Sequence, residues 1–276
     1  MSLTVIDWGA LALVVIVGLP HGAFDAAISL SMITSAQKIK QLIGILTSYL
    51  LLAIFVILVW YQFPEFSLFM FLIISVVHFG LADYSANPAQ IKWAYVIGHG
   101  GVVALWLPVI HKEEVTKLFA ILTNGPTPFL WQIMASLVLI WMVGTIVHLY
   151  QTLRSKQHYP AGFELIGLIV LAWIAPPLVT FAIYFCFIHS RRHFAFVWKQ
   201  LQSISTKRML INSAFLLSVA SWLMGGTLYW YLHLQMTVSD AALQTIFIGL
   251  AALTVPHMIL IDLIFRPYAV KTFEKN

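Results

Sequence analysis

Apolar runs of about 20 residues recur along this chain from one end to the other, and they limit the folds that it can adopt. Of the 276 residues, 61% are hydrophobic and only 9% are charged, whereas soluble domains carry about 25% charged residues. Such a chain cannot cover a water-facing surface with polar groups. The sequence therefore predicts an all-α fold, a polytopic transmembrane helical bundle.

Turn residues divide the apolar sequence into about nine predicted helices. The sixth is short, which is typical of a half-spanning or tilted segment. Neither a soluble domain nor an internal repeat interrupts the series, so we predict a single integral-membrane domain over residues 1–276. The predicted helices cover residues 7–33, 41–61, 66–84, 91–110, 128–150, 162–175, 178–198, 209–232 and 241–265.

The basic residues indicate how the chain is oriented in a membrane. If the N-terminus lies outside, the inner segments hold eleven lysines and arginines, and the outer loops hold only Lys112 and Lys117. Cytoplasmic loops are enriched in these residues, so we expect the C-terminus in the cytoplasm. Although the net charge is +5, the basic residues are spread thinly over loops and termini, and this distribution argues against a nucleic-acid partner. The lone Cys186 excludes an internal disulfide and a cysteine-rich metal site.

Two histidines four residues apart stand inside one of the most hydrophobic stretches of the chain, FCFIHSRRHF. On a helix, His189 and His193 would lie about 40° apart around the axis and about 6 Å apart along it. Two imidazoles at this spacing can chelate one metal ion, although they can equally hydrogen-bond to neighbouring helices. Because ionisable residues within a membrane are usually functional, we interpret the pair as candidate metal ligands.

Other histidines fall at a similar predicted depth on separate helices. His21 precedes Asp25 by one helical turn, so both stand on the same face. A carboxylate beside ligating histidines usually fixes the orientation of an imidazole ring, and we expect this role of Asp25. The remaining histidines of this layer are His78, His99 and His257. For His99 and His257, a satisfied core histidine is an open alternative.

A site of this composition suits several metals. Without thiolates, imidazole-rich sites bind iron, zinc, copper or nickel. Zinc-assisted hydrolysis would need water at the same depth, whereas redox iron would not. A metal centre that faces lipid also implies a lipid-soluble substrate or a gas such as O₂.

In these motifs the sequence resembles the Brp/Blh family, which comprises bacterial membrane β-carotene 15,15′-dioxygenases associated with rhodopsin systems. The matching segments run from the first predicted helix to the last, so the resemblance covers nearly the whole chain. The motifs are Pro20-His21-Gly22 with Asp25, His78-Phe79-Gly80 with Asp83, His189-Ser190-Arg191-Arg192-His193, and Pro256-His257 with Asp262.

The resemblance implies an iron(II) enzyme that uses O₂ to cleave the central double bond of β-carotene into two molecules of all-trans-retinal. It also implies a bacterial inner membrane as the location and a rhodopsin as the acceptor of retinal. The iron ligands implied by the resemblance are His21, His78, His189 and His193, with Asp25 as an orienting carboxylate and His99 and His257 as further candidates.

Two other functions fit parts of the pattern. Membrane di-iron hydroxylases and desaturases also resemble it, but their histidines form several tight clusters, and here only one tight pair occurs. A transporter with a His/Asp relay would suit helices broken at Pro20, Pro176 and Pro256. The sequence shows no inverted repeat, which makes a transporter the weaker alternative.

Overall fold

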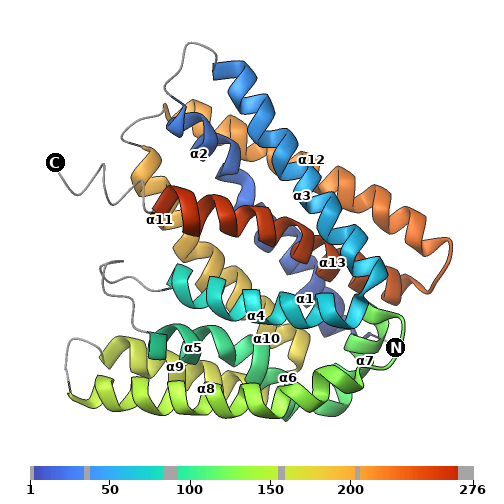
Figure 1. Ribbon diagram of the computed structural model, residues 1–276, viewed down its shortest axis with the longest axis vertical. Helices are drawn as coiled ribbons and strands as arrows, with labels where there is room; N and C mark the ends of the chain where they lie inside the picture. Colours follow the sequence, from blue (N-terminus) through green and yellow to red (C-terminus); the bar gives the residue numbers. More distant parts are fainter. Residues whose placement is uncertain (1–2, 34–37, 84–92, 155–158, 203–205, 267–276) are drawn as a thin grey trace. The chain divides into compact units, whose positions relative to one another are not determined.

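The computed structural model describes residues 3–33, 38–83, 93–154, 159–202 and 206–266, and the regular structure in these ranges is entirely helical (Figure 1). The all-α prediction is confirmed, and the nine predicted segments lie on helical chain with ends that differ by a few residues. The elements labelled η are wide π-helical turns, except η2, which is a tight 3-10 turn. In chain order the elements are α1 (Val5–Leu13), η1 (Val14–Gly18), η2 (Leu19–Phe24), α2 (Asp25–Met32), α3 (Lys38–Gln62), α4 (Pro64–Asp83), α5 (Trp93–Gly101), η4 (Val102–Trp106), α6 (Leu107–Ile110), α7 (Lys112–Thr123), α8 (Pro128–Arg154), α9 (Tyr159–Ile174), α10 (Pro177–Ile183), η6 (Tyr184–Ser190), α11 (Arg191–Leu201), α12 (Lys207–His233), α13 (Val238–Met258) and η7 (Ile259–Phe265).

Seven helical runs of the described chain are long and apolar enough to cross a membrane. Large apolar side chains are exposed on α3 and α12, for example Leu51, Phe55, Phe215 and Leu223. Exposed apolar surface of this extent is typical of a membrane-facing protein, and we identify the chain as an integral membrane protein. The seven runs are Val5–Met32, Lys40–Gln62, Pro64–Ala82, Trp93–Ile110, Pro128–Arg154, Lys207–His233 and Val238–Phe265.

The other two predicted helices have particular features. The helix α9 is apolar but only 16 residues long, in agreement with the short sixth segment of the prediction. The seventh predicted helix is a continuous helical run through α10, η6 and α11, and it carries Arg191 and Arg192.

The helix α7 is a further element, which lies where the sequence predicts a loop. Its buried side chains are those of Val115, Leu118, Phe119, Leu122 and Thr123, and they recur with the period of a helix. It is therefore an amphipathic helix between two longer apolar ones.

The described chain forms two compact units. The first consists of Leu3–Ala10 and Phe63–His189, and the second consists of Leu11–Gln62 and the residues from Ser190 onward. That the whole chain acts as one catalytic domain stays a prediction.

In the first unit, α5 packs against both α4 and α8 (Figure 1). Glycines allow the backbones of α4 and α5 to touch, because a Cβ on Gly80 would overlap the carbonyl group of Val96, and one on Gly100 would overlap that of Val76. Small residues permit this close approach between membrane helices. The reciprocal contact fixes the register of α4, and with it the position of His78.

Trp141 fixes α8 against α5. Its indole N–H donates a hydrogen bond of 2.9 Å to the carbonyl oxygen of Gly98. Its ring fills the space that a Cβ of Gly101 would need. The ring of Trp106 stacks on it with a centroid distance of 4.9 Å.

Replacing Trp141 by Phe keeps an aromatic ring and removes the hydrogen bond to Gly98. Because the carbonyl oxygen would stay buried without this donor, we expect a loss of about 1–3 kcal/mol in the free energy of unfolding. Thermal unfolding of the purified protein in detergent measures the change as a lower midpoint. The control is Trp93→Phe, whose ring is 57% exposed on α5. Equal midpoints for Trp141→Phe and the unchanged protein would contradict this account.

In the second unit, α13 packs against α3 and α12. A cluster of buried apolar residues, which includes Ile28, Leu210 and Ile261, joins α2, α11, α12 and η7. The indole N–H of Trp222 on α12 donates a hydrogen bond of 2.8 Å to the carbonyl oxygen of Val15 in η1. This bond satisfies a backbone carbonyl of a wide turn, as a low-dielectric surrounding requires.

Candidate metal centre

Two of the candidate ligands meet in the first unit. His78 lies on α4 and His189 lies on η6, and their ring centroids are 5.0 Å apart with planes inclined at 69°. Both side chains are buried, with exposed fractions of 1% and 0%. The fold thus makes neighbours of two histidines that are remote in the sequence.

Aromatic rings surround His189. The ring centroid of Phe79 lies 4.7 Å from that of His189, and Phe185 stacks nearly parallel to it at 5.8 Å. Tyr184, which is fully buried, lies at 6.4 Å. These rings exclude water from the imidazole, so charge and hydrogen bonding act there more strongly than they would in water.

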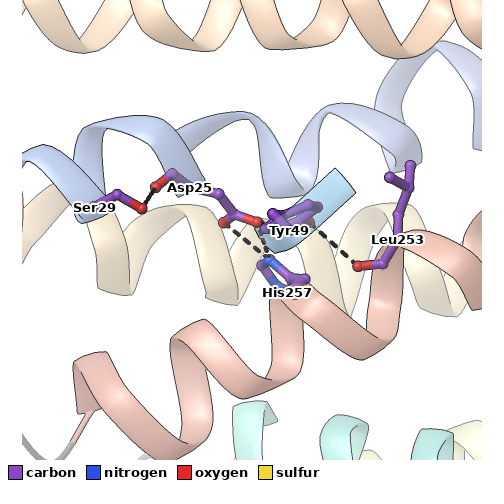
Figure 2. A network of polar contacts seen from close by, with 5 residues as sticks. All are labelled: Asp25, Ser29, Tyr49, Leu253 and His257. Carbon is purple, nitrogen blue, oxygen red and sulfur yellow. Dashed lines mark hydrogen bonds and ion pairs between the residues drawn. The ribbon is translucent and has the colours of Figure 1, made fainter. Parts of the chain in front are cut away.

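In the second unit, His257 and Asp25 form a buried pair (Figure 2). Nδ1 of His257 lies 3.0 Å from Oδ1 and 2.9 Å from Oδ2 of Asp25. The Tyr49 hydroxyl donates to Oδ2 of Asp25 at 2.9 Å and also lies 3.3 Å from the carbonyl oxygen of Leu253. The Ser29 hydroxyl donates to the main-chain carbonyl oxygen of Asp25 at 2.7 Å. The carboxylate is therefore held by groups from three helices.

His193 lies on α11 beside the same pair. Its ring centroid is 4.8 Å from that of His257, with planes inclined at 72°. His189 and His193 belong to different units but to one continuous helical run, in which η6 ends at Ser190 and α11 begins at Arg191. That this pair binds one ion stays a prediction.

The candidate ligand His21 lies in η2. Its side chain falls outside the described residues, as does that of Asp83. The next residue, Gly22, lies against the buried pair of the second unit, since a Cβ there would be 3.6 Å from Oδ2 of Asp25 and 3.6 Å from Nδ1 of His257. The main chain of η2 therefore passes directly beside this pair.

His99 lies on α5, with its ring stacked on that of Tyr95 at a centroid distance of 4.2 Å. The ring of His148 lies 5.7 Å away. Nε2 of His99 is 3.2 Å from the carbonyl oxygen of Ala161, and Nδ1 is 3.7 Å from a carboxylate oxygen of Glu164. This setting favours the alternative of a satisfied core histidine, and a role of His99 at the metal stays a prediction.

The two ring pairs have spacings that suit metal ligands. Imidazole nitrogens bind metals at about 2.0–2.1 Å, which places the centroids of rings on neighbouring coordination positions roughly 4.5–5.3 Å apart. The distances of 5.0 Å for His78–His189 and 4.8 Å for His193–His257 lie in this range. Nitrogen donors without thiolates fit iron(II) among other metals. Among the side chains that the structure describes, a set without His21, no group of three or more His, Cys, Asp or Glu lies close enough to hold an ion.

Tyr49 is a neighbour of Asp25 that the sequence motifs do not indicate. It stands in a long apolar helix, where a tyrosine is most simply interpreted as packing. The available signal is indirect: a buried carboxylate on one helix requires hydrogen-bond donors from others. That requirement does not specify which helix supplies them.

Comparisons with known proteins give a consistent result. Residues 12–265 match the family model described as "Beta-carotene 15,15'-dioxygenase". The protein named "Beta-carotene 15,15'-dioxygenase" from uncultured marine bacterium 66A03 is 64% identical over 276 residues, and the match covers 100% of both chains. The "Probable beta-carotene 15,15'-dioxygenase Blh" of Halobacterium salinarum is 24% identical over 289 residues, which cover 93% of this chain and 83% of that protein. No solved structure matches the chain.

The family match includes the helices that carry every candidate ligand, and the bacterial relative is similar over its full length. The resemblance seen in the histidine motifs is thereby confirmed, in preference to a di-iron hydroxylase or a transporter. The chain is an enzyme and belongs to the family of β-carotene 15,15′-dioxygenases.

Proposed function

We propose that this protein cleaves the central 15,15′ double bond of β-carotene with O₂ and releases two molecules of all-trans-retinal. The observation that carries the proposal is the 64% identity to a β-carotene 15,15′-dioxygenase over the full length of both chains. The buried histidine pairs support it, because they supply nitrogen donors inside an apolar protein. The atoms balance when the double bond breaks and each of its two carbons receives one oxygen atom of O₂.

The proposed cofactor is iron(II), with His21, His78, His189 and His193 as its ligands. When bound, iron(II) supplies the redox chemistry by which O₂ reacts with an electron-rich double bond. The support from the chain is the 5.0 Å spacing of His78 and His189 and the four-residue spacing of His189 and His193 on one helical run. The histidines hold the ion, and Phe79 and its aromatic neighbours exclude water from His189.

The proposed route of the substrate is through the membrane. β-Carotene dissolves in the hydrocarbon of the bilayer, which is about 30 Å thick, so entry between helices needs no passage through water. The depth of the site from this entrance would then determine which double bond lies beside the ion, since catalysis depends on positioning.

The proposed location is a bacterial inner membrane, with the N-terminus outside and the C-terminus in the cytoplasm. The excess of eleven basic residues over two supports this orientation. Retinal is apolar and would remain in the membrane, where a rhodopsin could bind it. This partner rests on the family resemblance alone.

Expression of the protein in bacterial cells that accumulate β-carotene is expected to change them from orange to nearly colourless, because cleavage at the centre halves the conjugated chain. Chromatography of the extracted pigments should show all-trans-retinal formed at about two molecules per molecule of β-carotene lost. Cells that carry the empty vector are the control.

Persistent colour in cells with normal amounts of protein and added iron would contradict the proposal. The metal content of the purified protein is an independent measure. About one iron per chain is expected, whereas two would favour a di-iron enzyme.

A further inference from the structure

The contacts of His257 differ from those of a histidine that only fills a helix interface. We propose that His257 is itself a nitrogen ligand of the metal ion, held in its binding orientation by Asp25 and, through Asp25, by Tyr49. The inference rests on the proposed function for the presence of iron, and it adds a fifth histidine to the four ligands proposed above.

The first argument concerns which nitrogen of His257 carries the proton. Both carboxylate oxygens of Asp25 lie within 3.0 Å of Nδ1. An ionised carboxylate only accepts hydrogen bonds, so Nδ1 is the donor, and the lone pair of the neutral ring is on Nε2. A metal-binding imidazole needs such a lone pair. Metal ligands of this kind commonly donate their other N–H to a carboxylate.

The second argument concerns how firmly Asp25 is held. Tyr49 donates to Oδ2 of Asp25 at 2.9 Å, and its hydroxyl lies 3.3 Å from the carbonyl oxygen of Leu253, one helical turn before His257 (Figure 2). The hydroxyl of α3 therefore contacts both the carboxylate of α2 and the helix that carries His257. A buried polar network with its members joined in this way restricts each of them to one orientation.

The third argument concerns the partner of His257. The ring of His193, one of the four ligands proposed above, lies 4.8 Å from that of His257 with planes at 72°. This distance is within the range for two imidazoles on neighbouring positions of one ion. Five nitrogen ligands still leave one position of a six-coordinate ion open.

The test compares three variants of the full-length protein in lipid nanodiscs: His257→Ala, Asp25→Asn and Tyr49→Phe. Two matched controls come from α12 of the same unit, where Tyr229 and His233 stack on each other at 5.8 Å. The controls are Tyr229→Phe and His233→Ala. The probe is Fe²⁺ alone under argon, and the affinity is measured by competition with a coloured chelator. Pulsed EPR of the nitric oxide adduct of the iron-loaded protein reports the imidazoles bound to the ion.

We expect His257→Ala to weaken iron binding by more than about 100-fold and to remove one imidazole signal, because a ligand costs more than its supporting group. Asp25→Asn should weaken binding by about 10–100-fold, as is usual for a carboxylate that orients a ligand. Tyr49→Phe should weaken it by less than about tenfold, since Asp25 keeps its contact with His257. Both controls should bind iron as the unchanged protein does.

An unchanged number of imidazole signals in His257→Ala would overturn the inference, even if the affinity fell. If His257→Ala does not fold, Asp25→Asn decides, because it preserves the shape of the side chain. Unchanged affinity and an unchanged imidazole spectrum in Asp25→Asn would then overturn the inference.

Failure of the proposed function is recognised separately. It would appear as an unchanged protein that binds no iron or leaves β-carotene intact. Full iron binding and cleavage by His257→Ala would instead leave the proposed function standing and remove only the fifth ligand.

Discussion

Alanine in place of His78 or His189 is expected to lower retinal formation by more than about 100-fold and to lower the iron content of the purified protein. Even the partners that only orient a metal ligand cost about 10–100-fold when they are replaced, and a ligand itself should cost more. The same result is expected for His21→Ala and His193→Ala. Retinal is measured by chromatography, and iron per chain by elemental analysis.

The matched control is His148→Ala. This side chain is also buried in the first unit, with 4% of its surface exposed, so its removal creates a comparable cavity. Loss of iron and activity in this variant as well would point to unfolding as the cause. Full iron content and full activity in His78→Ala or His189→Ala would refute the ligand assignment.

The substitution Gly100→Ala is expected to destabilise the first unit by at least about 1–3 kcal/mol, the usual cost of forcing an extra carbon into a packed interior. The added methyl group would overlap the carbonyl group of Val76, which is backbone and cannot turn aside. The helices α4 and α5 would have to separate, and His78, two residues from Val76, would move with α4. The expected results are a lower midpoint of thermal unfolding and weaker iron binding.

Gly167→Ala on α9 is the control for this substitution. A Cβ at Gly167 would meet nothing within 4 Å. Alanine is favoured over glycine inside a helix by about 0.5–1 kcal/mol, so this variant should be as stable as the unchanged protein or slightly more stable. Equal midpoints for Gly100→Ala and Gly167→Ala would show that the close contact of α4 and α5 contributes little.

The sequence predicts most of the helices because lipid leaves few alternatives. A segment in hydrocarbon must satisfy its own backbone hydrogen bonds, and a helix does so. The helix α7 is different, because its first turn, Lys112, Glu113 and Glu114, is charged and resembles a loop. The apolar spacing from Val115 to Leu122 is the signal that indicates it. Its end is also visible in the sequence, since Asn124 has a φ of 52° and precedes glycine.

The candidate site is predictable only within single helices. The four-residue spacing of His189 and His193 can be read directly from the sequence, as can that of His21 and Asp25. The contact between Asp25 and His257 joins residues 232 positions apart, and no periodicity relates them. Such partners are determined by how helices pack, which depends on details such as the touching backbones of α4 and α5.

The π-helical turn η1 makes the length of the chain before the site as important as its residue types. A wide turn holds more residues than an ordinary helical turn, so removing one residue from Val14–Gly18 would rotate all that follows by about 100° relative to what precedes it. Val15 is anchored by Trp222, so the rotation would carry the carboxylate of Asp25 away from His257. In an alignment of similar sequences, a one-residue gap in this stretch would mark a chain that has lost the site, even where every histidine is kept.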